Sequence, residues 1–190
     1  MKIDKMNELL KESLHPKRYE HSVNVMHEAV ILAQHYNINE KKAMTAGLLH
    51  DCGREIANGE AVDYAKSIGI KVGVVEKVQP VLLHAHVGRY IAEKKYGVTD
   101  KEILDAISFH TTGARGMDKL AMVVFLADLI EPGRDNKGAV KLRRLVRQDL
   151  EIAMLEAIKL NIEYLLESGR YIHPSCIDCW NYLLSGRDRE

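Results

Sequence analysis

A histidine and an aspartate stand side by side at the end of an apolar stretch, where polar side chains are costly to bury. His50 and Asp51 close residues 43–51 and share one face of a 3.6-residue helical period with the small apolar residues of that stretch. Burying an ionised carboxylate is unfavourable unless a cation or a hydrogen-bonded partner compensates its charge. The pair therefore indicates a metal site.

Four more polar residues repeat this pattern, because each lies on an otherwise apolar helical stripe. A single buried histidine is more often a hydrogen-bonded core residue, and that alternative stays open for any one of them alone. Six such residues on five predicted helices would each carry a desolvation cost if nothing compensated their burial. His and Asp side chains that converge in the core of a helical bundle are, in contrast, a familiar kind of metal site. The predicted ligands are His21, His50, Asp51, His84, His110 and Asp128.

The composition of this ligand set favours two metal ions. Two carboxylates and four neutral imidazoles carry a charge of −2, so two divalent ions leave +2, which suits an anionic substrate. Six ligands also exceed what one catalytic ion uses when it keeps coordination positions open for water and substrate. A pair of ions can share the six ligands, with Asp51 as a plausible bridge between the two ions. Imidazole and carboxylate without thiolate indicate Fe, Mn, Zn or Co, among which the spacing does not choose.

The elements that must position these residues are helical almost throughout, and no strand pattern is convincing. The segment after Pro16, with its stripe from His21 to Ala33, and the long segment 138–167 both have the apolar spacing of packed helices. We predict an all-α fold, a single-domain helical bundle over residues 1–190 with the metal site in its core and a frayed polar tail from about Gly186.

Polar residues that accept hydrogen bonds from free backbone N–H groups mark the starts of several predicted helices. Asn39 is the expected N-cap of the helix that ends at Asp51, and Asp118 that of the helix through Asp128. Thr99 followed by Glu102 predicts a capping box at the start of a further helix, which begins at these residues.

Length and charge restrict the class of protein. The 190 residues include 27 basic and 27 acidic side chains, so no global field attracts nucleic acid or an anionic membrane, and we expect neither as a partner. We expect a cytoplasmic protein, since the start lacks an apolar signal core, no apolar run approaches membrane-spanning length, and three cysteines suit a reducing compartment. A homodimer is left open.

The order of these residues resembles the H…HD…D skeleton of the HD-domain phosphohydrolases, which are metal-dependent all-helical enzymes. A sharper resemblance, over residues 14–184, is to the YqeK subfamily of that superfamily. The matching motifs are Arg18-Tyr19-x-His21, His50-Asp51, His84-Ala85-x-Val87-Gly88, His110-Thr111-x-Gly113 and Ala127-Asp128-x-Ile130-Glu131-Pro132-x-Arg134.

The resemblance implies a symmetrical diadenosine tetraphosphate hydrolase, which cuts the tetraphosphate bridge in its middle to release two ADP and typically holds iron. It also implies that the six residues above are the metal ligands. A metal-bound hydroxide is the expected nucleophile toward phosphorus, with Asp51, Arg54 and Arg134 as catalytic residues. The candidate substrate contacts are Arg18, Arg54, Thr111, Arg115, Glu131 and Arg134.

The chain departs from the family pattern directly after the HD pair. It reads Cys52-Gly53-Arg54, where the family is expected to have a larger residue, then Ala, then Lys. Arg54 keeps a cation that can hold phosphate through two hydrogen bonds. Cys52 is expected to pack as a small buried residue behind the ligands.

Several alternatives stay open at this level. The same metals can serve hydrolysis of another nucleotide, such as a deoxynucleotide, a nucleoside monophosphate or an NAD-related dinucleotide, or the protein can be a non-catalytic di-iron or nucleotide-binding sensor. His173, Cys176 and Cys179 have the spacing of zinc ligands but number only three, without a second Cys pair, so we do not expect a zinc site there. The histidines excluded as ligands by their positions are His15, His27, His35 and His86.

Overall fold

The computed structural model describes residues 1–187, and these are helical without strands, as predicted. The helices are α1 (Ile3–Ser13), α2 (Pro16–His35), α3 (Glu40–Leu49), η1 (Cys52–Glu55), α4 (Ala61–Ser67), α5 (Val74–Val78), η2 (Pro80–Leu82), α6 (Leu83–Lys94), α7 (Lys101–Phe109), α8 (Lys119–Ile130), α9 (Lys137–Leu145), α10 (Leu150–Glu167) and α11 (Pro174–Arg187), where η1 and η2 are 3₁₀ helices.

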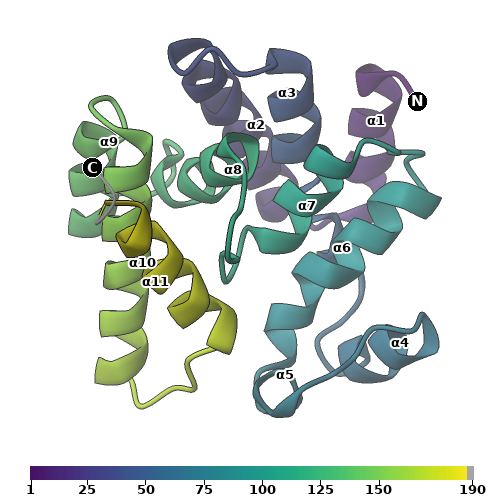
Figure 1. Ribbon diagram of the computed structural model, residues 1–190. Helices are drawn as coiled ribbons and strands as arrows, with labels where there is room; N and C mark the ends of the chain where they lie inside the picture. Colours follow the sequence, from purple (N-terminus) through teal and green to yellow (C-terminus); the bar gives the residue numbers. More distant parts are fainter. Residues whose placement is uncertain (188–190) are drawn as a thin grey trace.

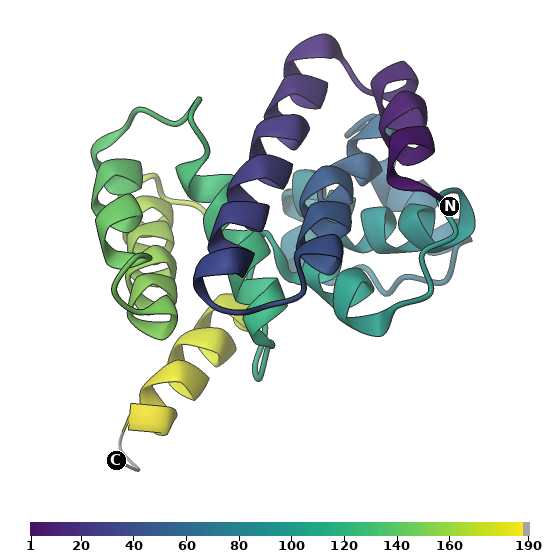
Figure 2. The same ribbon diagram turned by 90° about the horizontal axis from the view of Figure 1, so that it is seen from above.

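Helix α8 lies at the centre of the molecule, and its neighbours surround it (Figure 1). Its residues from Leu120 to Ala127 are all buried, as expected for a helix that is apolar on every side. Helices α2, α3 and α7 pack against α8, and α6 packs against α7. Figure 2 shows α2 running beside α3. This arrangement brings five helices of the chain around one core.

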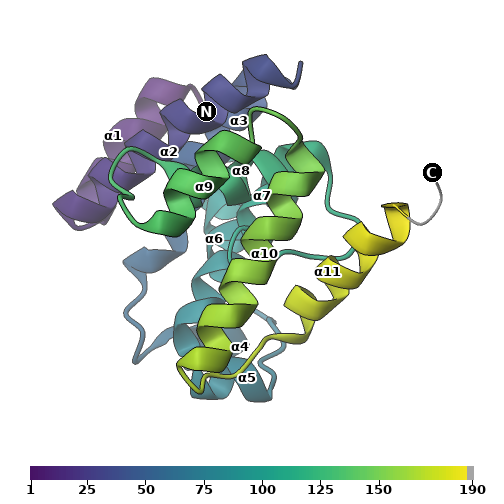
Figure 3. The same ribbon diagram turned by 90° about the vertical axis from the view of Figure 1, so that its left-hand side faces the viewer.

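The C-terminal helices α9, α10 and α11 form one side of the molecule (Figure 3). Helices α9 and α10 pack against α8 and against each other, and α11 packs on α10. Cys176 and Cys179 of α11 are buried, and the Cys179 thiol lies 3.8 Å from the sulfur of Met117. Burial raises the pKa of both thiols to about 11. Both cysteines are therefore part of the packed interior.

Two of the three predicted N-caps are confirmed, and the third is wrong by one residue. The side chain of Asn39 accepts hydrogen bonds at the start of α3 and that of Asp118 at the start of α8. At the start of α7 the cap is Asp100 rather than Thr99, because the Asp100 carboxylate accepts from the N–H groups of Glu102 and Ile103 at 3.0 and 3.4 Å. Asp100 has the extended backbone that an N-cap requires.

The segment 138–167 is two helices rather than one. Helix α9 ends at Leu145 and α10 begins at Leu150, where Asp149 accepts a hydrogen bond from the N–H of Ile152 at 2.8 Å. The turn lets α10 fold back onto α9. The apolar spacing continues through this turn, with Val146 buried like the helical residues around it, and for that reason periodicity alone did not reveal the break.

At the C-terminus α11 continues to Arg187, so Gly186 is helical, and the rest of the expected polar tail lies outside the described residues. None of the helices between residues 1 and 187 combines the length and the apolar character that a bilayer-spanning segment needs.

Candidate metal centre

The carboxylate of Asp51 lies in the middle of four imidazoles. Its Oδ1 lies 3.1 Å from Nε2 of His84 and 3.7 Å from Nε2 of His110. Its Oδ2 lies 3.6 Å from Nε2 of His50 and 3.9 Å from Nε2 of His21. Each oxygen of Asp51 therefore faces its own pair of histidines.

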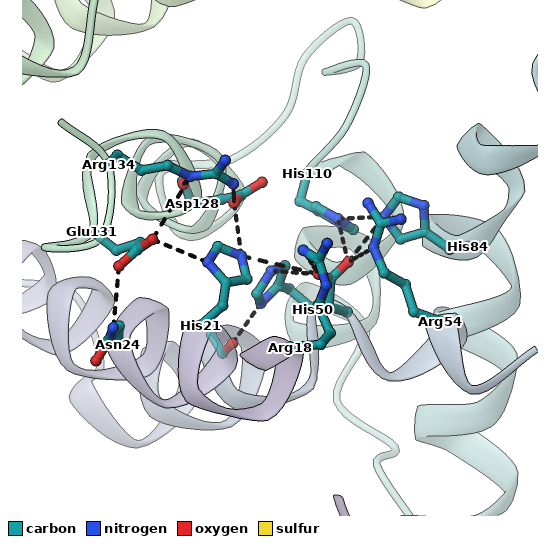
Figure 4. A network of polar contacts seen from close by, with 12 residues as sticks. Arg18, His21, Asn24, His50, Arg54, His84, His110, Asp128, Glu131 and Arg134 are labelled. Atoms are coloured by element: carbon teal, nitrogen blue, oxygen red, sulfur yellow. Dashed lines mark hydrogen bonds and ion pairs between the residues drawn. The ribbon is translucent and has the colours of Figure 1, made fainter. Parts of the chain in front are cut away.

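Asp128 of α8 extends this cluster on the side of His21, away from His84 (Figure 4). Its Oδ1 lies 3.0 Å from Nε2 of His21. Three overlapping groups have ligand atoms within 4.8 Å of one another, namely His21, His50 and Asp51; His50, His110 and Asp128; and Asp51, His84 and His110. The structure thus brings together all six residues that the sequence predicts as metal ligands.

Two of the histidines stand where helices end. Helix α3 stops at Leu49, two residues before the predicted end at Asp51, and α7 stops at Phe109, so His50 and His110 follow directly. The last carbonyl groups of a helix have no partner within it. The Nδ1 atom of His50 therefore bonds the Gly47 carbonyl, and that of His110 bonds the Ile107 carbonyl, both at 2.7 Å.

These bonds determine which ring nitrogen carries the proton. A carbonyl oxygen only accepts, so Nδ1 of His50, of His110 and of His84, which bonds the Val81 carbonyl, must be the N–H. In a neutral imidazole of this tautomer, the Nε2 atom carries no proton and has a free lone pair. Such lone pairs of His84 and His110 face each other at 3.0 Å beside a carboxylate, and Nε2 of His50 is buried without a hydrogen-bond partner among residues 1–187. This concentration of acceptors fits a bound cation.

The protonation states also suit metal ligands, which must be neutral imidazoles and ionised carboxylates. Burial lowers the pKa of His50 to about 4 and also lowers the pKa of His84. Burial alone would raise the pKa of Asp51, but the imidazoles of His50, His110 and His84 hold it well below its ordinary value. At neutral pH His50 and His84 are therefore neutral and Asp51 is ionised, which are the forms that bind a cation.

His21 is oriented by a carboxylate rather than by the main chain. Its Nδ1 lies 3.2 Å from Oε1 of Glu131, and Glu131 also accepts hydrogen bonds from Asn24 at 3.2 Å and from the N–H of Gly133. Burial lowers the pKa of His21, but Asp128, Glu131 and Asp51 outweigh that effect and raise it. Glu131 is only 4% exposed, so its position favours a role in orienting the His21 ring.

Three arginines border the cluster. Arg18 donates to Oδ2 of Asp51 at 2.8 Å, and Arg54 donates through Nε to Oδ1 at 2.7 Å. Arg134 donates to Oδ1 of Asp128 at 2.8 Å, at the opposite end of the cluster (Figure 4). Each arginine side chain stays 27–39% exposed, so their cationic groups form the boundary between the ligands and solvent.

A hollow of about 410 Å³ opens beside the cluster. Its wall consists of His15, Lys17, Arg18, His21, Glu131, Gly133 and Arg134. We name it the cationic hollow. Sequence reasoning did not single out Lys17 or His15 for it. The available signal was that Lys17 precedes the candidate Arg18 directly, at the start of α2.

The remaining candidate residues lie outside the wall of the cationic hollow. Thr111 follows His110 and is half-buried, and Arg115 is exposed with its guanidinium 5.8 Å from the ring centre of Tyr182. Their contact with substrate stays a prediction. Of the histidines excluded as ligands, His35 bonds the Arg147 carbonyl and His86 bonds Ser108.

Comparison with known proteins agrees with this geometry. The family model described as HD domain matches residues 18–133. The chain is 34% identical to the symmetrical bis(5'-nucleosyl)-tetraphosphatase of Bacillus subtilis, over 93% of this chain and 95% of that protein. It is 33% identical to the protein of the same name from Staphylococcus aureus, over 96% and 94%.

A solved structure agrees as well. The crystal structure of a protein from Clostridium acetobutylicum, described as a predicted HD superfamily hydrolase involved in NAD metabolism, superposes with a TM-score of 0.94 at 37% identity, over 98% of both chains. With its family match, its near full-length relatives and its cluster of histidines and aspartates, this chain belongs to the HD-domain family.

Proposed function

We propose that this protein hydrolyses diadenosine tetraphosphate symmetrically and releases two molecules of ADP. The observation that carries the proposal is the convergence of four imidazole Nε2 atoms on the two oxygens of Asp51, which suits a metal-dependent phosphohydrolase. The relatives that cover nearly the whole chain support the substrate, because they bear the name of this activity.

The six clustered residues are the proposed metal ligands. Two ions suit the set, because Oδ1 of Asp51 faces one pair of histidines and Oδ2 faces the other. Nitrogen and oxygen donors without thiolate are compatible with Fe, Mn, Co or Zn, and iron is our first choice from the family resemblance. When bound, such ions supply Lewis acidity toward phosphoryl oxygens and lower the pKa of coordinated water.

The arginines are the proposed phosphate contacts. Arg54 bonds Asp51 through Nε alone, and Arg134 bonds Asp128 through Nε and one terminal nitrogen, so each keeps further N–H groups for a phosphoryl oxygen. A planar guanidinium matches phosphate through paired hydrogen bonds and offsets the charge that develops during transfer. Arg18 and Lys17 add positive charge at the mouth of the cationic hollow.

Product analysis tests the proposal directly. The purified protein is loaded with Fe, Mn, Co or Zn and offered diadenosine tetraphosphate beside a deoxynucleotide, a nucleoside monophosphate and NAD. We expect ADP as the only nucleotide product from diadenosine tetraphosphate and no turnover by Asp51→Ala. Asp63→Ala, which removes a carboxylate that is 90% exposed, is the control and should retain activity.

Two results would contradict the proposal. Release of ATP and AMP would show that the bridge is cut asymmetrically. Tight nucleotide binding without turnover at every metal loading would identify a sensor.

A further inference from the structure

A second hollow, of about 680 Å³, lies between α9 and α10. We name it the α9–α10 hollow. We propose that it binds one adenine base of the substrate and of the ADP product; the inference rests on the proposed function, whose site it extends by a subsite for the nucleoside.

The two hollows share a wall residue. Arg134 lines both the cationic hollow and the α9–α10 hollow, and it bonds Asp128 of the metal centre at 2.8 Å. Leu129, the residue after Asp128, also lines the α9–α10 hollow. A nucleotide whose phosphates contact Arg134 therefore has a cavity beside those phosphates into which its nucleoside can extend.

The two hollows differ in chemistry as the two ends of a nucleotide do. The cationic hollow is lined mainly by charged and imidazole side chains, which suit phosphates. The α9–α10 hollow has an apolar floor of Ala139, Leu142, Ala157 and Leu160. Its volume lies within the roughly 300–1,000 Å³ typical of small-molecule sites, which are largely apolar with a few polar groups. A flat heteroaromatic base meets both conditions.

Tyr164 supplies an aromatic ring at this hollow. Its side chain is 53% exposed although it belongs to a helix that packs on the core. The guanidinium of Arg170 lies 5.6 Å from the ring centre, within the range of a cation–π contact, and the ring stays exposed. An exposed aromatic ring beside an apolar floor can serve as a stacking platform for a base.

Asn161 supplies an amide that can read the edge of the base. Of the two asparagines in the wall, Asn136 is engaged, because its Oδ1 accepts the N–H of Ala139 as the N-cap of α9. The side chain of Asn161 makes no hydrogen bond within the part of the chain that the structure describes. An asparagine amide matches the N6 donor and N7 acceptor of adenine, whereas guanine presents two acceptors there.

Calorimetric titration of the metal-loaded protein with ADP, GDP and inorganic pyrophosphate tests this subsite. Tyr164→Ala should weaken ADP binding by at least about fivefold, from the loss of stacking, and leave pyrophosphate binding unchanged. Asn161→Ala should reduce the preference for ADP over GDP. The matched control is Tyr171→Ala, which removes a tyrosine that is 51% exposed and lies outside the hollow, and it should bind all three probes like the unmodified protein.

The outcomes separate this inference from the proposed function. Unchanged ADP binding in Tyr164→Ala and Asn161→Ala would overturn the subsite even if diadenosine tetraphosphate is cut to ADP. An equal loss of ADP and pyrophosphate binding would also overturn it, because the effect would then belong to the phosphate end. Base-dependent binding through Tyr164, in a protein that fails to cut diadenosine tetraphosphate, would keep the subsite and reject the proposed substrate.

Discussion

At the scale of residues, the ligand histidines differ in what holds their rings. His50, His84 and His110 each bond a main-chain carbonyl three residues earlier, so local backbone geometry sets their orientation. His21 instead depends on the side chain of Glu131, which lies 110 positions away in sequence. His21 is therefore the ligand whose orientation a single distant substitution can disturb.

Glu131→Gln should lower metal affinity or activity by roughly 10–100-fold, the usual effect of losing a partner that orients a metal ligand. Glutamine has nearly the same shape but loses the negative charge, and its amide nitrogen cannot accept from His21 or Asn24. Metal titration by calorimetry, with activity at saturating metal, measures both quantities. Glu163→Gln, an exposed carboxylate of α10, is the control, and equal behaviour of the two variants would show that Glu131 does not position His21.

At the scale of elements, the metal centre requires a close approach between η1 and α6. A Cβ on Gly53 would overlap the carbonyl oxygen of His84 and lie 2.6 Å from the backbone nitrogen of Gly88. Cys52 is fully buried and donates to the Gly88 carbonyl at 3.3 Å, which confirms its expected packing. The departure at Cys52-Gly53 from the pattern expected in the sequence analysis thus coincides with a tight contact that positions His84 beside Asp51.

Gly53→Ala should destabilise the protein by about 1–3 kcal/mol, the usual cost of overpacking, and should weaken metal binding because η1 and α6 must separate. Denaturant unfolding of the metal-free protein and metal titration measure the two effects. Gly59→Ala is the matched control, since a Cβ there meets nothing within 4 Å. Native stability and metal affinity in Gly53→Ala would show that this contact relaxes without consequence.

The start of α7 offers a test of the corrected N-cap. Asp100→Ala should lower the free energy of unfolding by about 1 kcal/mol, because it removes the acceptor for the N–H groups of Glu102 and Ile103 and an ion pair with Lys42 at 2.9 Å. Thr99→Ala should change that free energy by less than about 0.5 kcal/mol, since Thr99 is exposed and makes no cap bond. The reverse ranking in denaturant unfolding would restore the capping box at Thr99.

At the scale of the whole molecule, the ligands come from positions 21 to 128, helices α9 and α10 pack against the central α8, and α11 packs on α10. One core of buried apolar residues extends from Met6 to Leu183, and on this basis we propose that the chain folds as a single HD-type domain. Because ligands from five helices meet at one point, binding of metal there must be coupled to folding of the whole.

Metal loading should therefore raise the melting temperature strongly. Metal at about 1,000 times its Kd adds about 4 kcal/mol, which corresponds to roughly 8–16 °C for a chain of this length. Differential scanning calorimetry before and after chelation measures this rise, and a single cooperative transition is expected in both states. Asp51→Asn should lose most of the rise; if it keeps the full rise, the stabilising ion binds elsewhere.

The sequence by itself determined the helical class, the starts of α3 and α8 and the six clustered residues, because a histidine or carboxylate on an apolar helical stripe is evident from local spacing. Only the tertiary structure decided which oxygen of Asp51 faces which histidines, where α9 turns into α10, and that Lys17 and Arg134 share one hollow. Those features depend on how distant helices pack, and a helical period fixes the face of each residue but not the neighbour that this face will meet.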